Sequence, residues 1–488
     1  MRSTRKILSR RTIRIILAAL TPLLSFALFP LSAQAQSGSS SATLKLPPYR
    51  KTKLPNGLTI LLMEKHNLPL VSFNMAVKTG STSDPAGNEG TASITAALLR
   101  KGTKTRSAEQ YSNDLDFIGG SFNAGASTDS TLISAEFMKK DLAKGLDLLS
   151  DPILNPTFPA DEFTKLVAQR KDGARAAKDQ AAGVIGAYFN SYLLGGHPYA
   201  RPTNGDELSL AQLTRDAVTK FYATYYKPGN AILSVVGDFN SAEMEKTLAA
   251  QFGGWVNAAV PPVPLSAPAP VQGKRLLLVD KPDSTQTYFR IGNVGIARTN
   301  PDRVYVNVVN TLFGGRFTSM INSALRIQSG LTYGANAGFD ERKVAGPFFI
   351  NTYTRNATTE RAMDMALDVL KQLHDKGITD EQLASAKSYL KGQFPLRIET
   401  SDQLANQIVE LELYGLDAKE IDDFYPKVDS MTLADARRVI DKYYPLDNLV
   451  FVVIGKASEI GPIMKKYATK EDTRSISEPG YWPASGTH

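Results

Sequence analysis

The sequence predicts an α+β fold with two homologous domains, each a mostly antiparallel sheet with helices packed on one side, joined by a proline-rich linker. Three observations predict this fold class. Short apolar runs typical of strands alternate with longer amphipathic segments typical of helices. Residues 257–273 contain five prolines and no charged side chain. The halves of the chain on either side of this stretch repeat each other.

The repeat is clearest where a helix leads into an apolar strand. Three residues of the first half precede their counterparts in the second half by 218 positions: Tyr226, Asn230 and Gly237 match Tyr444, Asn448 and Gly455. Further back, the acidic pairs Asp161-Glu162 and Asp380-Glu381 each open a helix, 219 positions apart. Matches in the same order at nearly constant spacing indicate a duplicated domain of roughly 220 residues.

Each half contains several β-type runs between its helices. They lie at 58–65, 71–81 and 130–137 in the first half and at 275–281, 286–295 and 346–354 in the second. Helices on one side of a mostly antiparallel sheet are the natural layering for this order. The stretch 127–137 also suggests a sheet edge that pairs with an extended peptide, although a purely structural strand is the alternative.

The N-terminus is typical of an export signal. Six Lys and Arg side chains precede an apolar run from Ile15 to Leu31, which ends at the small-residue site Ala33-Gln34-Ala35. A retained transmembrane helix is the alternative, but the run is short for a membrane span. The predicted organisation is a signal peptide at 1–35, a flexible leader at 36–46, an N-terminal domain at 47–256, the linker at 257–273, a C-terminal domain at 274–470 and a tail at 471–488.

Charge and cysteine content exclude several classes of function. Removing the predicted signal peptide lowers the formal net charge from +8 to +2, with charges of both signs mixed along the chain. Such a chain lacks the clustered basic face that binds nucleic acid, and no integral membrane segment is predicted after the signal peptide. The absence of cysteine excludes disulfides, cysteine nucleophiles and cysteine-ligated metals.

An ordered set of motifs identifies a family resemblance over about residues 47 to 470. In the first half these are Leu54-Pro55-Asn56-Gly57-Leu58-Thr59, Val77-Lys78-Thr79-Gly80-Ser81, Gly90, Lys101-Gly102-Thr103 and Gly119-Gly120-Ser121-Phe122-Asn123-Ala124. In the second half they are Gly314-Gly315-Arg316-Phe317-Thr318-Ser319, Leu325-Arg326 and Gly330-Leu331-Thr332-Tyr333-Gly334. The set resembles the pitrilysin or insulinase family of zinc peptidases, close to the two-domain processing peptidases.

The chain departs from this family at the zinc motif. Active members carry H-x-x-E-H on one helix, where two His ligate zinc and the Glu polarises the bound water. Alignment on Gly90 and Lys101-Gly102-Thr103 places Ser93, Ala96 and Ala97 at these positions. The family's third ligand, a Glu, falls within residues 169–179, where alignment leaves Ala176 or a neighbour and the only carboxylates are Asp172 and Asp179. We therefore predict no metal in this chain.

The four histidines do not suggest a relocated metal site. His66, His197, His374 and His488 are far apart in the sequence, so only a long-range pair assembled by folding stays open. His197, in a glycine-rich loop, is interpreted as a surface or hydrogen-bonding residue.

The resemblance implies that the substrate-binding half of the site survives. Arg326 and Tyr333 match the Arg and Tyr that the family uses opposite the zinc, where they hold the scissile carbonyl and stabilise the oxyanion. Gly314 and Gly315 are predicted to support this loop. In the structural alternative, Arg326 is a solvated helix cation, Tyr333 a core ring and Gly314-Gly315 only a turn.

These residues predict a non-catalytic, substrate-binding subunit of a heteromeric secreted peptidase. A homologous catalytic partner would carry H-x-x-E-H and the zinc, and this chain would bind the peptide substrate in the periplasm. The alternative is a stand-alone peptide-binding or scaffold protein of the cell envelope. A hydrolase that uses Ser93 is a weaker third hypothesis, because no His or Asp near Ser93 in the sequence would activate it.

Overall fold

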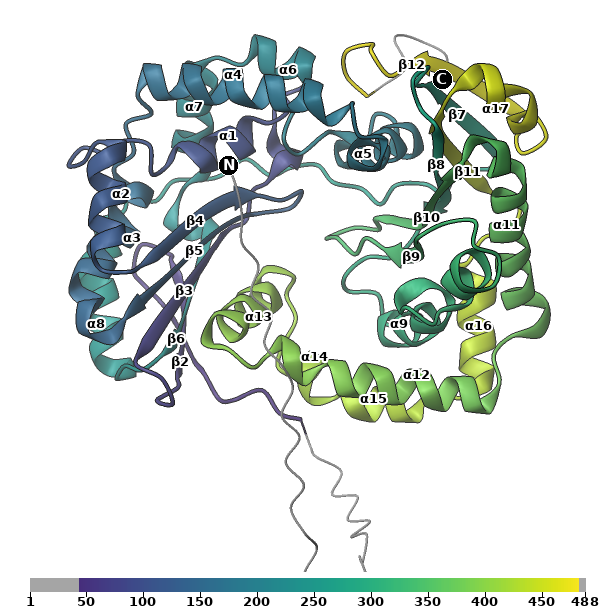
Figure 1. The fold of residues 1–488 in the computed structure, drawn as a ribbon. Helices are drawn as coiled ribbons and strands as arrows, with labels where there is room; N and C mark the ends of the chain where they lie inside the picture. Colours follow the sequence, from purple (N-terminus) through teal and green to yellow (C-terminus); the bar gives the residue numbers. More distant parts are fainter. Residues whose placement is uncertain (1–43, 482–488) are drawn as a thin grey trace, which may run out of the picture. The chain divides into compact units, whose positions relative to one another are not determined.

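The computed structural model describes residues 44–481, and all of these belong to one compact unit (Figure 1). The predicted signal peptide, the leader up to residue 43 and His488 lie outside the described residues. Among the residues that are described, no helix has the length and apolar character needed to cross a membrane.

Two six-stranded sheets form the framework. The first contains β1 (Arg50–Lys53), β2 (Thr59–Glu64), β3 (Leu70–Val77), β4 (Ser121–Ala126), β5 (Thr131–Met138) and β6 (Ala231–Gly237), in the order β1-β2-β6-β3-β5-β4. The second contains β7 (Lys274–Asp280), β8 (Gln286–Val294), β9 (Ala335–Phe339), β10 (Pro347–Arg355), β11 (Leu449–Gly455) and β12 (Lys470–Ser475), in the order β12-β7-β11-β8-β10-β9.

The two sheets repeat one topology, which confirms the predicted α+β fold with two homologous halves. The pair β2 and β6 is parallel, as is the matching pair β7 and β11, and the strands from β6 to β4 and from β11 to β9 run antiparallel. The outermost strands differ, because β1 pairs antiparallel with β2 whereas β12 pairs parallel with β7.

One face of each sheet packs against several helices. On the first sheet these are α1 (Thr91–Leu98), α2 (Ala108–Phe117), α3 (Leu142–Leu154), α6 (Glu207–Gln212), α7 (Arg215–Tyr225) and α8 (Ser241–Phe252). On the second sheet they are α9 (Arg303–Asn310), α11 (Thr359–Lys376), α12 (Asp380–Gln393), α15 (Phe424–Ser430), α16 (Leu433–Tyr443) and α17 (Ala457–Met464).

The opposite face of each sheet is covered by a helix of the other half, so the prediction of helices on one side is incomplete. Helix α5 (Ala181–Leu194) packs on β7 and β11, and α13 (Ser401–Leu413) packs on β2 and β6 (Figure 1). The Tyr192 hydroxyl donates to the Leu276 carbonyl at 3.0 Å, and the Ser234 hydroxyl donates to the Ala405 carbonyl at 2.7 Å. Because both faces of these strands are buried, their sequences are continuous apolar runs.

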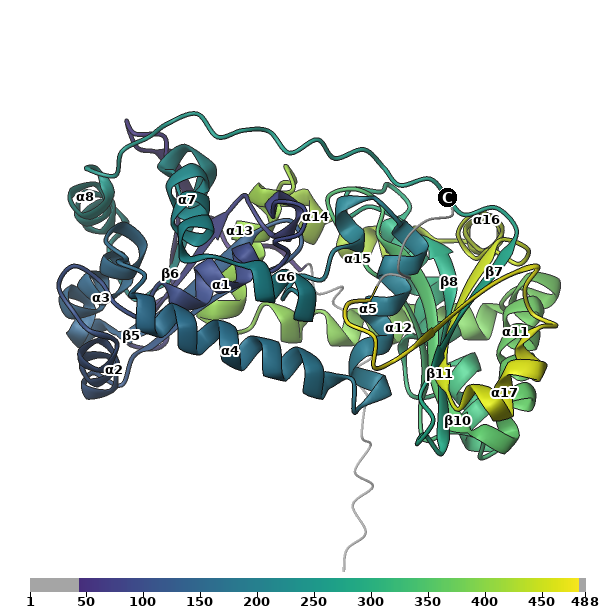
Figure 2. The ribbon, with the colours of Figure 1, turned by 90° about the horizontal axis from the view of Figure 1, so that it is seen from above.

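Three further segments can be compared with their predictions from the sequence. Residues 255–272 contain neither helix nor strand and lead from α8 to β7 (Figure 2). Residues 471–475, predicted as tail, instead belong to β12 and complete the second sheet. The predicted sheet edge at 127–137 is wrong, because β5 lies between β3 and β4; the strand at the end of the sheet is β4.

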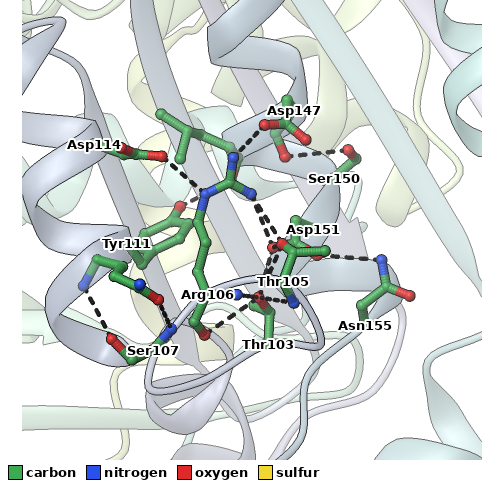
Figure 3. Close-up of polar contacts among 12 residues, drawn as sticks. Thr103, Thr105, Arg106, Ser107, Tyr111, Asp114, Asp147, Ser150, Asp151 and Asn155 are labelled. Carbon is green, nitrogen blue, oxygen red and sulfur yellow. Dashed lines mark hydrogen bonds and ion pairs between the residues drawn. The ribbon is translucent and has the colours of Figure 1, made fainter.

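The Lys101-Gly102-Thr103 turn is held by a charged cluster around Arg106 (Figure 3). Arg106 Nη1 donates to Asp151 Oδ2 at 3.1 Å, and its other nitrogens bind Asp114 and Asp147. The Thr103 hydroxyl donates to the same Asp151 oxygen at 2.6 Å. This motif of the sequence therefore fixes the turn that follows α1.

Candidate functional site

The helix that carries the zinc motif in the resembling peptidases is present as α1. The Ser93 side chain is buried, and its hydroxyl donates to Asn204 Oδ1 at 2.8 Å. Ala96 is 1% exposed and Ala97 is partly buried. An alanine has no side-chain donor atom, and the Ser93 hydroxyl already has an amide partner. These three positions therefore do not fit zinc.

The N-terminus of α1 is fixed by a buried carboxylate. Asp84 accepts hydrogen bonds from the backbone N–H groups of Gly90 and Ala92, both at 2.8 Å. Burial outweighs these two bonds and raises the pKa of Asp84 to about 7. Gly90 has φ +95°, and a Cβ there would lie 2.9 Å from the Gly205 nitrogen. This close approach seats α1 directly against the loop that carries Asn204.

Helix α4 (Ala160–Ala177), which contacts α1, offers no third ligand. The α4 residues that line the neighbouring cavity include Gly173, Ala174 and Ala177. Asp172 and Ala176 are exposed and do not line it. Across residues 44–481, no group of three or more His, Asp or Glu side chains is placed to hold a metal ion.

The described histidines serve separate local contacts. His66 lies within hydrogen-bond distance of Asp238 and Glu64, and His374 of the Tyr444 carbonyl oxygen. His197 Nε2 lies 2.8 Å from the Ser266 carbonyl oxygen, and its Nδ1 accepts from the Tyr199 N–H at 3.0 Å. The hydrogen-bonding interpretation of His197 is therefore the one that the structure supports.

A cavity of about 760 Å³ is lined by α4, α5 and residues 199–205 of the loop after α5. We call it the α4 cavity. It is lined by small residues of α4 and α5 and by polar side chains that include Arg170, Asn190, Tyr199, Arg201, Asn204 and Arg342. Its wall includes Asn204, the partner of Ser93, so it lies next to the position where the family resemblance places the zinc.

A second cavity, of about 560 Å³, gathers most of the substrate-binding residues predicted from the sequence. We call it the Arg326 cavity. Gly314, Gly315 and Arg326 line it, together with the aromatic side chains Tyr288, Tyr353 and Tyr389. The Tyr288 and Tyr353 rings stack at 5.1 Å between centroids. No sequence motif singles out these tyrosines, because Tyr288 and Tyr353 lie on strands and Tyr389 on helix α12, where each also fits a purely structural role.

Local backbone structure places Arg326 and the glycine pair. A Cβ on Gly314 would lie 2.3 Å from the Ala337 nitrogen, so only glycine permits this turn to approach β9. Arg326 lies on the helical turn Ser323–Gln328, with its guanidinium 4.8 Å from the centre of the Phe317 ring. Phe317 is itself 60% exposed, which leaves this cation–π pair accessible to a ligand.

Tyr333 lies beside this cavity rather than in its wall. Its side chain is 79% exposed, so the interpretation as a core ring is wrong. The next residue, Gly334, lines the Arg326 cavity, and Tyr333 precedes the edge strand β9. Helix α5 separates the two cavities, because Gly183 and Ala187 line the α4 cavity while Ala182 and Ile185 line the Arg326 cavity.

Comparison with protein-family models decides the family. Residues 59–206 match the model described as insulinase, peptidase family M16, and residues 212–390 match the model described as the peptidase M16 inactive domain. The chain belongs to the M16 peptidase family. This confirms the predicted family, and the M16 inactive-domain match includes Gly314, Gly315, Arg326 and Tyr333.

Proteins named as zinc proteases match most of the chain. A protein named as an uncharacterized zinc protease of Streptomyces coelicolor is 24% identical over 437 residues, which covers 86% of this chain and 91% of that protein. A similarly named protein of Mycobacterium tuberculosis is 26% identical over 403 residues, covering 81% of this chain and 91% of that protein.

Two solved structures share the fold. A structure described as a peptidase M16 inactive domain from Pseudomonas fluorescens superposes with a TM-score of 0.79 at 26% identity, covering 84% of this chain and 98% of that one. A protease from Helicobacter pylori also gives a TM-score of 0.79, at 23% identity, over 84% of this chain and all of that one.

Proposed function

We propose that this M16 chain is the non-catalytic, substrate-binding subunit of a heteromeric secreted zinc metallopeptidase. Its partner would be a homologous chain that carries H-x-x-E-H and the zinc. The observation that carries this proposal is the contrast between the two sites. Helix α1 is folded and hydrogen-bonded with Ser93, Ala96 and Ala97 at the motif positions, whereas Arg326 and Tyr333 remain exposed.

The exposed pair supplies the donors that peptide hydrolysis requires. A guanidinium and a phenol can donate hydrogen bonds to the oxygen that becomes negatively charged when water attacks a peptide carbonyl. Within residues 44–481, Arg326 has no carboxylate partner and the Tyr333 hydroxyl has no hydrogen-bond partner. Both side chains are therefore free to bind a substrate at a zinc site supplied by the partner.

Two sheet edges support peptide binding. β4 and β9 each end their sheet, so each pairs with a neighbouring strand on one side only. An extended peptide can add to such an edge through backbone hydrogen bonds. β9 begins two residues after Tyr333 and contributes Ala335 and Asn336 to the Arg326 cavity.

Reconstitution tests this function. The purified chain should contain no stoichiometric zinc and cleave no peptide, and a secreted H-x-x-E-H homologue should restore cleavage when mixed with it. Arg326→Ala and Tyr333→Phe should each lower the kcat of the complex by about 10²-fold, the magnitude for loss of one oxyanion donor. Arg355→Ala, an exposed arginine at the end of β10, is the matched control. Full activity of the metal-free chain alone would refute the proposal.

A stand-alone peptide-binding or scaffold protein of the cell envelope is the second candidate, favoured by the same absence of zinc ligands at Ser93, Ala96 and Ala97. It predicts unchanged kinetics of the complex after Arg326→Ala. Periplasmic localisation is part of both proposals, and cell fractionation with N-terminal sequencing of the mature chain, expected near Gln36, tests it.

A further inference from the structure

We propose that the α4 cavity binds a carboxylate of a peptide ligand, in particular the free C-terminal carboxylate, through Arg170 and Arg201. The inference rests on the proposed peptide-binding function and names a second subsite for it. It concerns the place beside α1 and α4 where the active family members are expected to bind their metal.

The wall of the α4 cavity is positively charged. Three arginines line the α4 cavity, and no Asp or Glu side chain is among its lining residues. The rest of the wall is neutral, with amide and hydroxyl groups such as those of Gln169, Asn190 and Thr203. A cavity lined by one sign of charge raises the local concentration of ligands of the opposite sign.

Two of the three guanidinium groups have no ion-pair contact within residues 44–481. Arg342 is paired with Asp340 and lies 4.8 Å from the centre of the Tyr199 ring. Arg170 has no ion pair within residues 44–481. Arg201 donates to the backbone carbonyl of Asp84 at 2.8 Å and interacts electrostatically with the buried Asp84 carboxyl, whose pKa is raised to about 7 by burial. Unpaired guanidinium donors match the geometry of a carboxylate, which they can bind through two parallel hydrogen bonds.

A further cation lies near the same helix. Arg290 of β8 packs between the rings of Phe189, on α5, and Phe349, at 5.8 and 4.4 Å, and has no ion-pair partner in the described part of the chain. Burial lowers the pKa of Arg290 to about 10, so it remains charged at neutral pH.

The dimensions favour the end of a peptide over a small ion. The cavity volume of about 760 Å³ is within the range of sites that hold drug-sized ligands. Small residues of α4 and α5, Gly173, Ala174, Gly183 and Ala187, leave room for a peptide backbone. A C-terminal segment would fill this space and place its carboxylate against the two unpaired arginines.

Fluorescence anisotropy with three labelled alanine-rich hexapeptides tests the proposal on the full mature chain. One has a free C-terminus, one a C-terminal amide, and one a C-terminal amide with an internal aspartate. We expect the free acid to bind at least tenfold more tightly than the amide, because a charge-assisted hydrogen bond is worth this much or more. Raising the NaCl concentration from 50 to 500 mM should reduce the difference.

Matched variants locate the effect. Arg170→Gln should remove most of the acid-over-amide preference, whereas Arg175→Gln, an exposed arginine of the same helix that does not line the cavity, should leave it intact. If Arg201→Gln fails to fold, Arg201→Lys replaces it. This variant keeps a cation and should retain part of the acid-over-amide preference. Circular dichroism and thermal melting check folding of each variant.

The outcomes separate this subsite from the proposed catalytic role. Equal binding of the three peptides, or equal effects of Arg170→Gln and Arg175→Gln, would overturn the carboxylate site even if Arg326→Ala still abolished turnover with a partner. Tight binding of the internal-aspartate peptide would confirm the carboxylate chemistry and identify a side chain as its source.

Discussion

The Ser93 hydroxyl donates to Asn204 Oδ1 at 2.8 Å, which ties the zinc-motif helix to the loop that lines the α4 cavity. At the first position of the motif, a side chain that would ligate zinc in an active peptidase is replaced by a structural hydrogen bond. The helix is held in its place in the fold by this bond and by the buried Asp84.

Restoring the motif by Ser93→His, Ala96→Glu and Ala97→His should not restore a zinc site. Catalytic zinc sites use three protein ligands, and the α4 residues facing the α4 cavity provide no third one. Ala96 is 1% exposed, so a glutamate there should also lower the melting temperature. Elemental analysis of the purified triple variant checks the first expectation, and calorimetry the second.

Ser93→Ala is the control for that experiment. It should lower the free energy of unfolding by about 1 kcal/mol, the contribution of one hydrogen bond, and should leave the metal content unchanged. One tightly bound zinc per chain in the triple variant would contradict this expectation and show that the chain provides a third ligand.

Arg106→Met should destabilise the fold by about 3 kcal/mol, because it leaves the buried carboxylate of Asp151 without its cation. Lys144→Met, which removes a cation from the same cluster, is the matched control. Lys144 is 41% exposed and pairs with Asp114, so its loss should cost less than about 1 kcal/mol. Urea unfolding of both variants measures the difference, and equal midpoints would contradict the structural role assigned to Arg106.

Sequence patterns predicted the interior strands well and the sheet edges poorly. Strands β2, β3, β6, β7, β8, β10 and β11 coincide with apolar runs, since burial imposes their composition. The outer strands β4, β9 and β12 have sequences SFNAGA, ANAGF and KEDTRS, which contain few large apolar residues. They are strands because a neighbour offers a hydrogen-bonding edge, which depends on tertiary pairing.

Helix α5, which packs on the sheet of the other half, did leave a pattern in the sequence. The α5 segment AAGVIGAYFNSYLL is apolar nearly all round, which indicates a helix buried on more than one side. By contrast, Arg170, Arg201 and Arg342 are isolated cations in three separate segments. Only the packing of α4 against the loops after α5 and β9 brings them to one cavity, and no local spacing could have predicted that.

Because α5 and α13 each pack on the sheet of the other half, we expect the two sheets to unfold together. Each sheet relies on a helix of the other half, so neither core is complete alone. Differential scanning calorimetry should give one unfolding transition. Ile408→Ala, which truncates a fully buried side chain on α13, should shift this single transition to lower temperature and reduce the free energy of unfolding by roughly 2 to 5 kcal/mol.

Leu396→Ala, at a side chain that is 55% exposed, is the control and should change stability little. Two resolved transitions, of which Ile408→Ala shifts only one, would show that the halves fold independently.

Asp84 gives the fold a pH dependence whose sign can be worked out. Its pKa is raised from 3.8 to about 7 in the folded chain because the carboxyl group is buried. Between these pH values the folded chain holds a proton that the unfolded chain has lost. The stability contributed by Asp84 is therefore complete below about pH 4 and is lost as the pH rises through 7.

Asp84→Asn removes this titration but keeps the shape of the side chain. The variant should be less stable at pH 5, because its amide can accept from only one of the Gly90 and Ala92 N–H groups. As the pH rises to 8, the wild type should lose about 3 kcal/mol relative to the variant. Urea unfolding at a series of pH values measures the gap, with Asp172→Asn on the exposed face of α4 as the control. If the stability difference in favour of the wild type instead widens as the pH rises, the hydrogen bonds from the two N–H groups outweigh the effect of burial and keep Asp84 ionised.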